Sequence, residues 1–293
     1  MRRVPKIYPV NLASLMIRMS RSENMPVIPQ SLASIIRMSE NGDISARAIE
    51  KTLERDLSVS TKLLKVANSP CYGGGNVNTI SRAIQMLGSS GITSVVTSLA
   101  MQALISGVSA SKRFDRIEYW KHSLATAVCC RIVGRMQMPL QAEELYAAGL
   151  MHDVGLIMMD RFIPAELDYC LEESAASGLP LHCVEQDRLG YTHAEVGALL
   201  AEKWAFSPLT VNGIRFHQQP EMDAQYQKTS SVVHIADCFA HEAGFDNNQP
   251  AGLHSPDPFF LKKLDIAPET AKVIEEVTAV EVKKAVEAFH AAA

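Results

Sequence analysis

The chain has 293 residues, of which 47% are apolar, 20% charged and only 6% aromatic, which indicates an ordinary soluble protein rich in aliphatic helices. It is long enough for one large or two modest domains and can bury a core without disulfides. With a formal net charge of −4 and scattered basic residues, its electrostatics favour neither nucleic acid nor an anionic membrane as a partner.

The cysteines and the apolar stretches suggest where the protein resides. The six cysteines form no C-x-x-C pair and lie mostly in apolar helical contexts, so reduced, buried thiols account for them most simply. No uninterrupted apolar stretch reaches the roughly 20 residues needed to cross a bilayer, and no signal peptide is recognisable. We therefore expect a cytoplasmic protein of a bacterial kind.

The first part of the chain is predicted to be an arm followed by helices. Residues 1–24 show no clean period and are interpreted as the arm. Apolar residues at helical spacing then predict helices at about residues 30–38, 45–56, 59–68, 80–87 and 92–105. Asn41 and Gly42 would stop the first of them, three glycines at 73–75 would form an exposed turn, Thr79 would cap the fourth and Gly88 would end it.

A break at residues 106–109, followed by Lys112 and Arg113, is interpreted as a short hinge between two helical halves. Further helices are predicted at about residues 117–136, through His152 and Asp153, at 165–176, after Pro180, and at 192–205, 209–217 and 232–241, with a loop at 244–258 and a helical tail at 268–289. No segment alternates with period two. The chain is therefore predicted to be all-α, a two-part helical bundle in which residues 25–110 pack on residues 111–245, with residues 246–293 forming a loop and C-terminal helices.

The second half carries the residues that suggest chemistry. His152 and Asp153 are adjacent in an apolar run, where burying either side chain without a hydrogen-bond or charge partner is unfavourable. Imidazoles and carboxylates spread over several helices can converge on the centre of a bundle, and together they suit divalent transition metals such as Fe, Mn, Zn or Ni. The candidate ligands are Glu118, His122, His152, Asp153, His193, His217 and Asp237.

These residues resemble the HD superfamily of metal-dependent phosphohydrolases, whose pattern is a His, then His-Asp, then a late Asp. His122, His152, Asp153 and Asp237 match that pattern. His193 and His217 resemble the additional metal ligands of the HD-GYP branch, in which Glu118 would match a carboxylate ligand. Two positions depart from that branch, because Leu156 replaces a lysine and Gln218 replaces a second histidine.

Blocks in the first half resemble the HDOD family, the HD-related output domain. They are MPVIP at 25–29, ERDLS at 54–58, LKVANS at 64–69 and ISRAIQMLG at 80–88, and the resemblance covers about residues 24 to 245. It implies an N-terminal helical part packed on an HD-like part. It also implies a signalling or regulatory module that acts through a protein partner or a small nucleotide, without demonstrated catalysis.

Two functions stay open at this point. The first is a non-catalytic regulatory module with a retained metal pocket; the second is a metal-dependent phosphohydrolase of a nucleotide or cyclic dinucleotide, with Asp153 at the catalytic metal. Leu156 favours the first, since it offers no charged donor to a developing anion, and one lost donor of that kind costs about 2.7–4 kcal/mol of transition-state stabilisation. Arg215 and Lys203 are the cations that could substitute as ligand-binding residues.

Each candidate ligand also has a structural interpretation. The central residues could be a vestigial polar cluster that satisfies itself, His193 could be an exposed imidazole at the start of a helix, and Glu118 could be there because the helix dipole favours a carboxylate in the first turn. His234 and His241 share a helical face with Asp237 and are interpreted as its hydrogen-bond neighbours and not as ligands.

Overall fold

The computed structural model describes residues 10–22, 29–40, 45–69, 75–106, 109–247 and 255–292. Every regular element within these ranges is a helix, which confirms the predicted all-α class. The expected stop at Asn41 and Gly42, the first two glycines of the turn at 73–75 and the centre of the loop at 244–258 lie outside the described residues.

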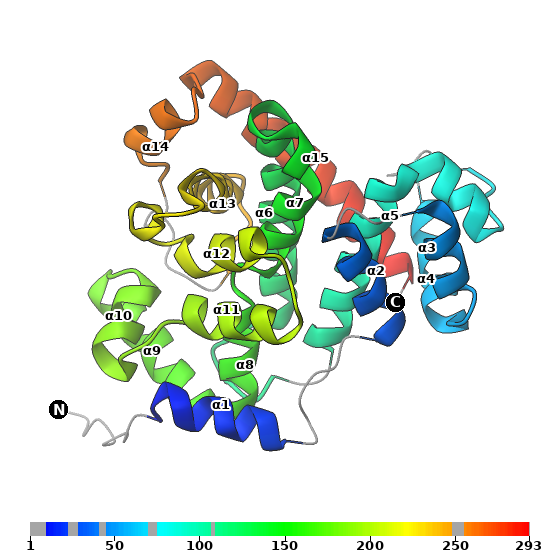
Figure 1. The fold of residues 1–293 in the computed structure, drawn as a ribbon. Coiled ribbons are helices and arrows are strands. Elements are labelled where there is room, and N and C mark those ends of the chain that lie inside the picture. The colour runs from blue at the N-terminus through cyan, green and yellow to red at the C-terminus, as the bar shows by residue number, and fades with distance from the viewer. Residues whose placement is uncertain are drawn as a thin grey trace.

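The N-terminal half forms the right-hand part of the molecule in Figure 1. Its helices are α2 (Gln30–Glu40), α3 (Ala46–Leu53), α4 (Leu57–Ala67) and α5 (Ile80–Ile105). Side chains of Ser45, Asp56 and Thr79 cap α3, α4 and α5 by accepting a backbone N–H three residues later. Gly88 adopts φ 71°, a conformation that favours glycine, and this kink divides α5 into the two helices that were predicted.

The HD-like half is built around the long helix α6 and the shorter α7, which pack side by side in the middle of Figure 1. Its elements are α6 (Arg116–Gln137), α7 (Ala142–Met151), α8 (Val154–Phe162), α9 (Pro164–Ser177), α10 (Leu181–Leu189), α11 (His193–Lys203), α12 (Pro208–Phe216) and α13 (Gln227–Glu242), with short 3-10 turns η2 (Pro139–Gln141) and η3 (Pro220–Met222). The expected helix through His152 and Asp153 is instead two helices, α7 and α8. The chain breaks at Asp153, whose backbone has φ −101° and ψ 13°.

Two helices were not predicted. One is α1 (Leu12–Arg21), so the interpretation of residues 1–24 as an arm without periodicity was wrong for this segment. Asn11 caps α1, and its buried Leu15 and Met19 are four residues apart, a stripe too short to stand out in the sequence. The other is α14 (Pro258–Lys263), which Asp257 caps at the end of the predicted loop.

The two halves share one core. A single contiguous cluster of buried side chains contains Ile49 and Leu63 of the N-terminal half together with Leu124 and Leu156 of the HD-like half. The last helix, α15 (Pro268–Ala292), packs against α4 as well as α6 and α13, and so connects both halves across the top and right of Figure 1. The predicted packing of one half on the other is therefore confirmed.

Polar contacts fix the hinge between the halves. The Asp160 carboxylate on α8 accepts hydrogen bonds from the Ser109 hydroxyl at 2.8 Å and from the backbone N–H groups of Ala110 and Ser111 at 3.0 and 2.7 Å. Its other oxygen accepts from Arg116 Nε at 2.7 Å, and the same guanidinium donates to the carbonyls of residues 105 and 106 at the end of α5. The hinge is thus bonded to α8 and is not a free tether.

By length and composition, α5 is the one helix among the described residues that could cross a membrane. In the fold, however, 61% of its apolar window is buried inside the protein. This burial is what a core helix requires, and α5 packs accordingly on α2, α3, α4 and α7.

Candidate metal centre

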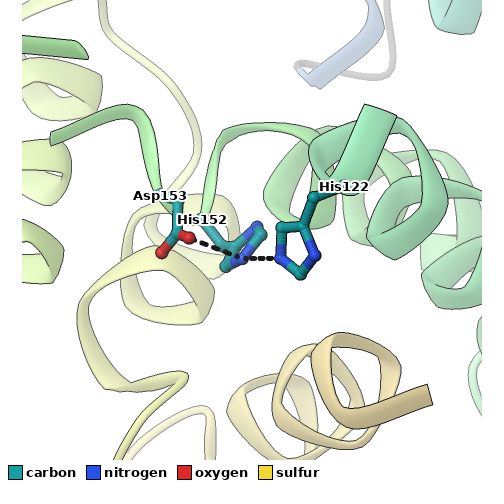
Figure 2. Close-up of side chains that lie close together, drawn as sticks. All are labelled: His122, His152 and Asp153. Carbon is teal, nitrogen blue, oxygen red and sulfur yellow. Dashed lines mark hydrogen bonds and ion pairs between the residues drawn. The ribbon is translucent and has the colours of Figure 1, made fainter. Parts of the chain in front are cut away.

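Six of the seven candidate ligands meet at one point in the HD-like half. His122 comes from the middle of α6, His152 and Asp153 from the break between α7 and α8, His193 from the start of α11, His217 from the end of α12, and Asp237 from α13. Each of these residues is at most 2% exposed. Figure 2 shows three of them, with His152 between His122 and Asp153.

Two glycines beside the His-Asp pair allow the surrounding helices to approach. A Cβ on Gly149 would lie 2.6 Å from Cys130 Sγ and 3.0 Å from the Thr126 carbonyl oxygen, so α7 can press on α6 only without a side chain there. A Cβ on Gly155 would lie 1.9 Å from the backbone oxygen of His193. The contact of α8 with the start of α11 brings His193 to Asp153, and Gly155 makes that contact possible.

Gly155→Ala is therefore expected to lower the free energy of unfolding by about 3 kcal/mol, since the new methyl group meets backbone that cannot rotate away. Gly91→Ala is the control, because a Cβ there meets only the Cβ of Leu87, one turn earlier on the same helix, at 3.1 Å. Urea unfolding followed by circular dichroism measures both variants. Equal stability of Gly155→Ala and the unmodified protein would show that α8 and α11 do not make this close contact.

Hydrogen bonds fix which nitrogen of each imidazole faces the centre. His122 Nδ1 lies 2.7 Å from the Phe245 carbonyl oxygen, His152 Nδ1 2.7 Å from that of Gly149, and His217 Nδ1 2.7 Å from that of Ile214. A carbonyl oxygen can only accept, so Nδ1 carries the proton in all three rings. When these rings are neutral, each presents the lone pair of Nε2 to the centre, which is how metal-binding histidines are held in proteins.

Carboxylate oxygens face the Nε2 atoms of His122, His193 and His217. Asp237 Oδ1 lies 3.0 Å from His122 Nε2, and Asp153 Oδ1 lies 3.1 Å from His193 Nε2 and 3.4 Å from His217 Nε2. Asp153 Oδ1, His193 Nε2 and Asp237 Oδ1 are buried without a hydrogen-bond partner. Two electron-rich atoms at this distance in an apolar interior need a cation between them, either a proton or a metal.

The arrangement fits metal ions in chemistry as well as in position. Asp153 turns Oδ2 toward His152 at 3.4 Å and Oδ1 toward His193 and His217, so it faces two groups of ligands. Ligand atoms within 4.8 Å of one another form the triads His122–His152–Asp153, His122–Asp237–His241 and Asp153–His193–His217. Such His and Asp clusters could bind one or two divalent transition metals with Asp153 shared between them.

Protonation of the metal-free cluster follows the same charges. Burial by itself lowers the pKa of His152, but the charges and hydrogen bonds of Asp153 and Asp237 outweigh it and raise that pKa to about 10. Burial by itself raises the pKa of Asp153, but the neighbouring His152 and His193 hold that pKa well below its usual range. The pKa of His217 is lowered, chiefly by burial. Protons on imidazoles therefore supply the positive charge that the carboxylates need when no metal is bound.

The remaining predicted residues lie elsewhere. Glu118 is not brought to the cluster, because its carboxylate pairs with Lys121 at 2.7 Å and is 47% exposed. Lys203 lies ten residues along α11 from His193, about 15 Å at helical rise, and lines a separate cavity against α1. Arg215 pairs with Glu202 at 2.6 Å and lines a cavity of about 180 Å³ together with Gln218. Leu156 is fully buried in the core.

Two residues of the site, Glu185 and Asn247, were not predicted, and His241 was predicted as a neighbour of Asp237 but not as a ligand. His241 lies one turn after Asp237 on α13, with Nε2 3.6 Å from Asp237 Oδ1, and so joins a ligand triad; His234 instead places Nδ1 2.8 Å from the His217 carbonyl oxygen. Glu185 is fully buried and accepts from His193 Nδ1 at 2.7 Å. Its position on the apolar face of α10, four residues from both Leu181 and Leu189, was the available signal.

The other residue of the site that was not predicted is Asn247. It follows α13, is 1% exposed, and donates its side-chain amide to Asp153 Oδ2. No periodicity marks a residue in an irregular segment, so no sequence signal pointed to it.

Comparisons with known proteins agree with this fold. A structure from Shewanella amazonensis SB2B, provisionally named a phosphohydrolase, has a TM-score of 0.71 at 24% identity and covers 96% of this chain and 98% of its own. A structure from Marinobacter aquaeolei VT8, provisionally named a signal transduction protein, has a TM-score of 0.76 at 19% identity and covers 91% of this chain and 59% of its own. At these identities the likeness shows the fold alone.

Sequence similarity supplies the family. An uncharacterized protein of Treponema pallidum (strain Nichols) is 27% identical over 220 residues, which are 74% of this chain but 42% of that protein, so the chain spans about two fifths of this curated relative. Residues 25–220, more than half of the chain, match the HDOD domain. The chain therefore belongs to the HDOD domain family.

Proposed function

We propose that the chain is a regulatory HDOD module that holds at least one divalent transition metal in a closed centre and does not hydrolyse phosphate esters. The observation that carries the proposal is the set of buried imidazole nitrogens that face carboxylate oxygens at 3.0–3.4 Å. His122, His152, Asp153 and Asp237 would hold the first ion. His193 and His217, with the other oxygen of Asp153, would hold a second.

The surroundings of the centre favour a structural or regulatory role for the metal. Catalytic metal sites keep an open coordination position, whereas structural sites are closed. Here the six side chains that would hold the ions are each at most 2% exposed: His122, His152, Asp153, His193, His217 and Asp237. Leu156 fills a buried position where the HD-GYP branch has a lysine. Arg215 is paired with Glu202, and Lys203 lines a separate cavity against α1. The centre therefore has few means to bind and neutralise a phosphate ester.

Output would pass through a protein partner or a small nucleotide ligand in the cytoplasm. A resemblance in fold to the Marinobacter protein, named provisionally for signal transduction, supports this part of the proposal. All five described cysteines are free, which suits a reducing compartment.

The second candidate function is hydrolysis of a nucleotide or a cyclic dinucleotide. The complete set of ligand types favours it, as does the provisional phosphohydrolase name of the Shewanella protein. A metal bound here would supply an activated water of lowered pKa. Asp153 would orient the ion, and the cavity lined by Arg215 and Gln218 would receive the substrate.

We expect no sustained turnover of cyclic dinucleotides or nucleotides when Mn, Fe and Ni are supplied in turn, because the centre is closed and Leu156 provides no donor to the developing charge. Product formation is followed by chromatography for the unmodified protein and for Asp153→Ala, which sets the background. A rate near the ordinary enzyme range, about 1 per second or more, that disappears in Asp153→Ala would overturn the proposal and establish the hydrolase.

A further inference from the structure

The segment that follows α13 returns over the metal centre. The Phe245 carbonyl oxygen accepts from His122 Nδ1 at 2.7 Å, Asp246 Oδ1 lies 3.1 Å from His241 Nδ1, and Asn247 Nδ2 donates to Asp153 Oδ2. Three consecutive residues thus each bind a different side chain of the centre. The segment 245–247 is anchored at every residue.

Asn247 differs from its two neighbours because its side chain is buried at 1% exposure and its carbonyl oxygen Oδ1 has no hydrogen-bond partner. An amide nitrogen and oxygen are about 2.2 Å apart, given bond lengths of about 1.33 and 1.23 Å, so Oδ1 lies in the immediate neighbourhood of the Asp153 carboxylate. A buried carbonyl oxygen without a partner is unfavourable, and ligation of a cation satisfies it, since amide oxygens are common ligands of divalent ions.

The orientation of the amide excludes the opposite arrangement. If Asn247 were turned by 180°, its oxygen would take the place of Nδ2 against Asp153 Oδ2, and two acceptor oxygens would be in contact. Nδ2 must therefore face Asp153, and Oδ1 is left as an acceptor beside it. Oδ1 is therefore the atom of this amide that is free to ligate an ion held by Asp153.

We infer that Asn247 is a further ligand of the metal centre and takes the coordination position that a hydrolytic site leaves to water. This inference rests on the proposed metal centre and deepens it. The amide nitrogen holds Asp153, the amide oxygen ligates the ion, and the segment 245–247 covers both. Without a free position for water the centre cannot generate a metal-bound nucleophile, which gives the closed state a specific cause.

The experiment loads the full chain with Mn²⁺ and measures both affinity and water access. Affinity is obtained by titration with electron paramagnetic resonance, and exchange of metal-bound water from the relaxation rate of solvent protons. In the unmodified protein we expect tight binding and little enhancement of relaxation. In Asn247→Ala we expect about 10–100-fold weaker binding, the range for loss of a supporting group at a metal site, and a marked rise in relaxation per bound ion as water enters.

Further variants separate ligation from simple covering. Asn247→Asp keeps an oxygen for the ion but loses the Nδ2 donor to Asp153, so relaxation per bound Mn²⁺ should stay low whatever the change in affinity. Asn247→Leu keeps the bulk without the oxygen and should bind as weakly as Asn247→Ala. The control is Asn212→Ala, because Asn212 is a half-buried asparagine outside the cluster, and its amide donates to the Pro208 carbonyl within its own helix. Far-ultraviolet circular dichroism shows which variants are folded.

The outcomes are distinguishable. Absence of Mn²⁺ from the unmodified protein would overturn the metal centre and with it this inference. Tight Mn²⁺ binding with strong relaxation in the unmodified protein would overturn the role of Asn247 alone and leave the metal centre standing. Unchanged affinity in Asn247→Leu would likewise exclude ligation by the amide oxygen.

Discussion

Asp153→Asn is expected to reduce the metal bound per chain to background, with an affinity loss above about 100-fold, because this carboxylate faces both groups of ligands. Elemental analysis of protein purified without added metal or chelator measures the occupancy. Asp187→Asn is the control, since Asp187 is an acidic residue on the surface of α10 and 74% exposed. His152→Ala is expected to lose the first ion in the same way.

Equal and near-zero occupancy in the unmodified protein and both variants would contradict the metal centre and favour a polar cluster that satisfies itself with protons. The pH dependence of binding provides a second test. The pKa of His152 is raised to about 10 in the metal-free protein, so at neutral pH an entering ion must displace a proton. Metal affinity should therefore increase as pH rises, and proton release on binding should be measurable by calorimetry in two buffers.

Asp160→Ala is expected to lower the free energy of unfolding by about 3–5 kcal/mol, because it leaves the buried guanidinium of Arg116 without its counter-ion. The two side chains are 0% and 8% exposed, and three further donors from residues 109–111 lose their acceptor. Trypsin should cut the hinge of this variant at Lys112 or Arg113, while the unmodified protein resists. Urea unfolding and electrophoresis of timed digests measure the two effects.

Asp187→Ala serves again as the control and should change stability by no more than about 0.5 kcal/mol, as exposed substitutions generally do. Rapid cutting of the unmodified protein at Lys112 or Arg113 that released two separately stable fragments would show that the halves are independent. That result would disagree with the core that joins them and with the position of α15 across both.

The helical class and many helix boundaries could be predicted from the amino-acid sequence alone. Thr79 caps its helix as expected, and Thr192, the first residue of the predicted helix at 192–205, forms a capping box with Glu195. Gly88 interrupts α5 where a helix was predicted to end. These features could be predicted because caps, kinks and apolar periods depend on residues within one or two turns of each other. The candidate ligands on α6, at the His-Asp pair and on α11, α12 and α13 were found through their resemblance to a known pattern.

Which of these residues meet in the cluster depends on the tertiary structure. Glu118 and His122 share a helical face in sequence, yet one pairs with Lys121 at the surface and the other lies at the centre. Glu185 and Asn247 reach the cluster from elements 32 and 94 residues away from Asp153, through contacts that no local pattern encodes. The break of the chain at Asp153 likewise depends on long-range packing, because the close contact at Gly155 sets where α8 lies against α11.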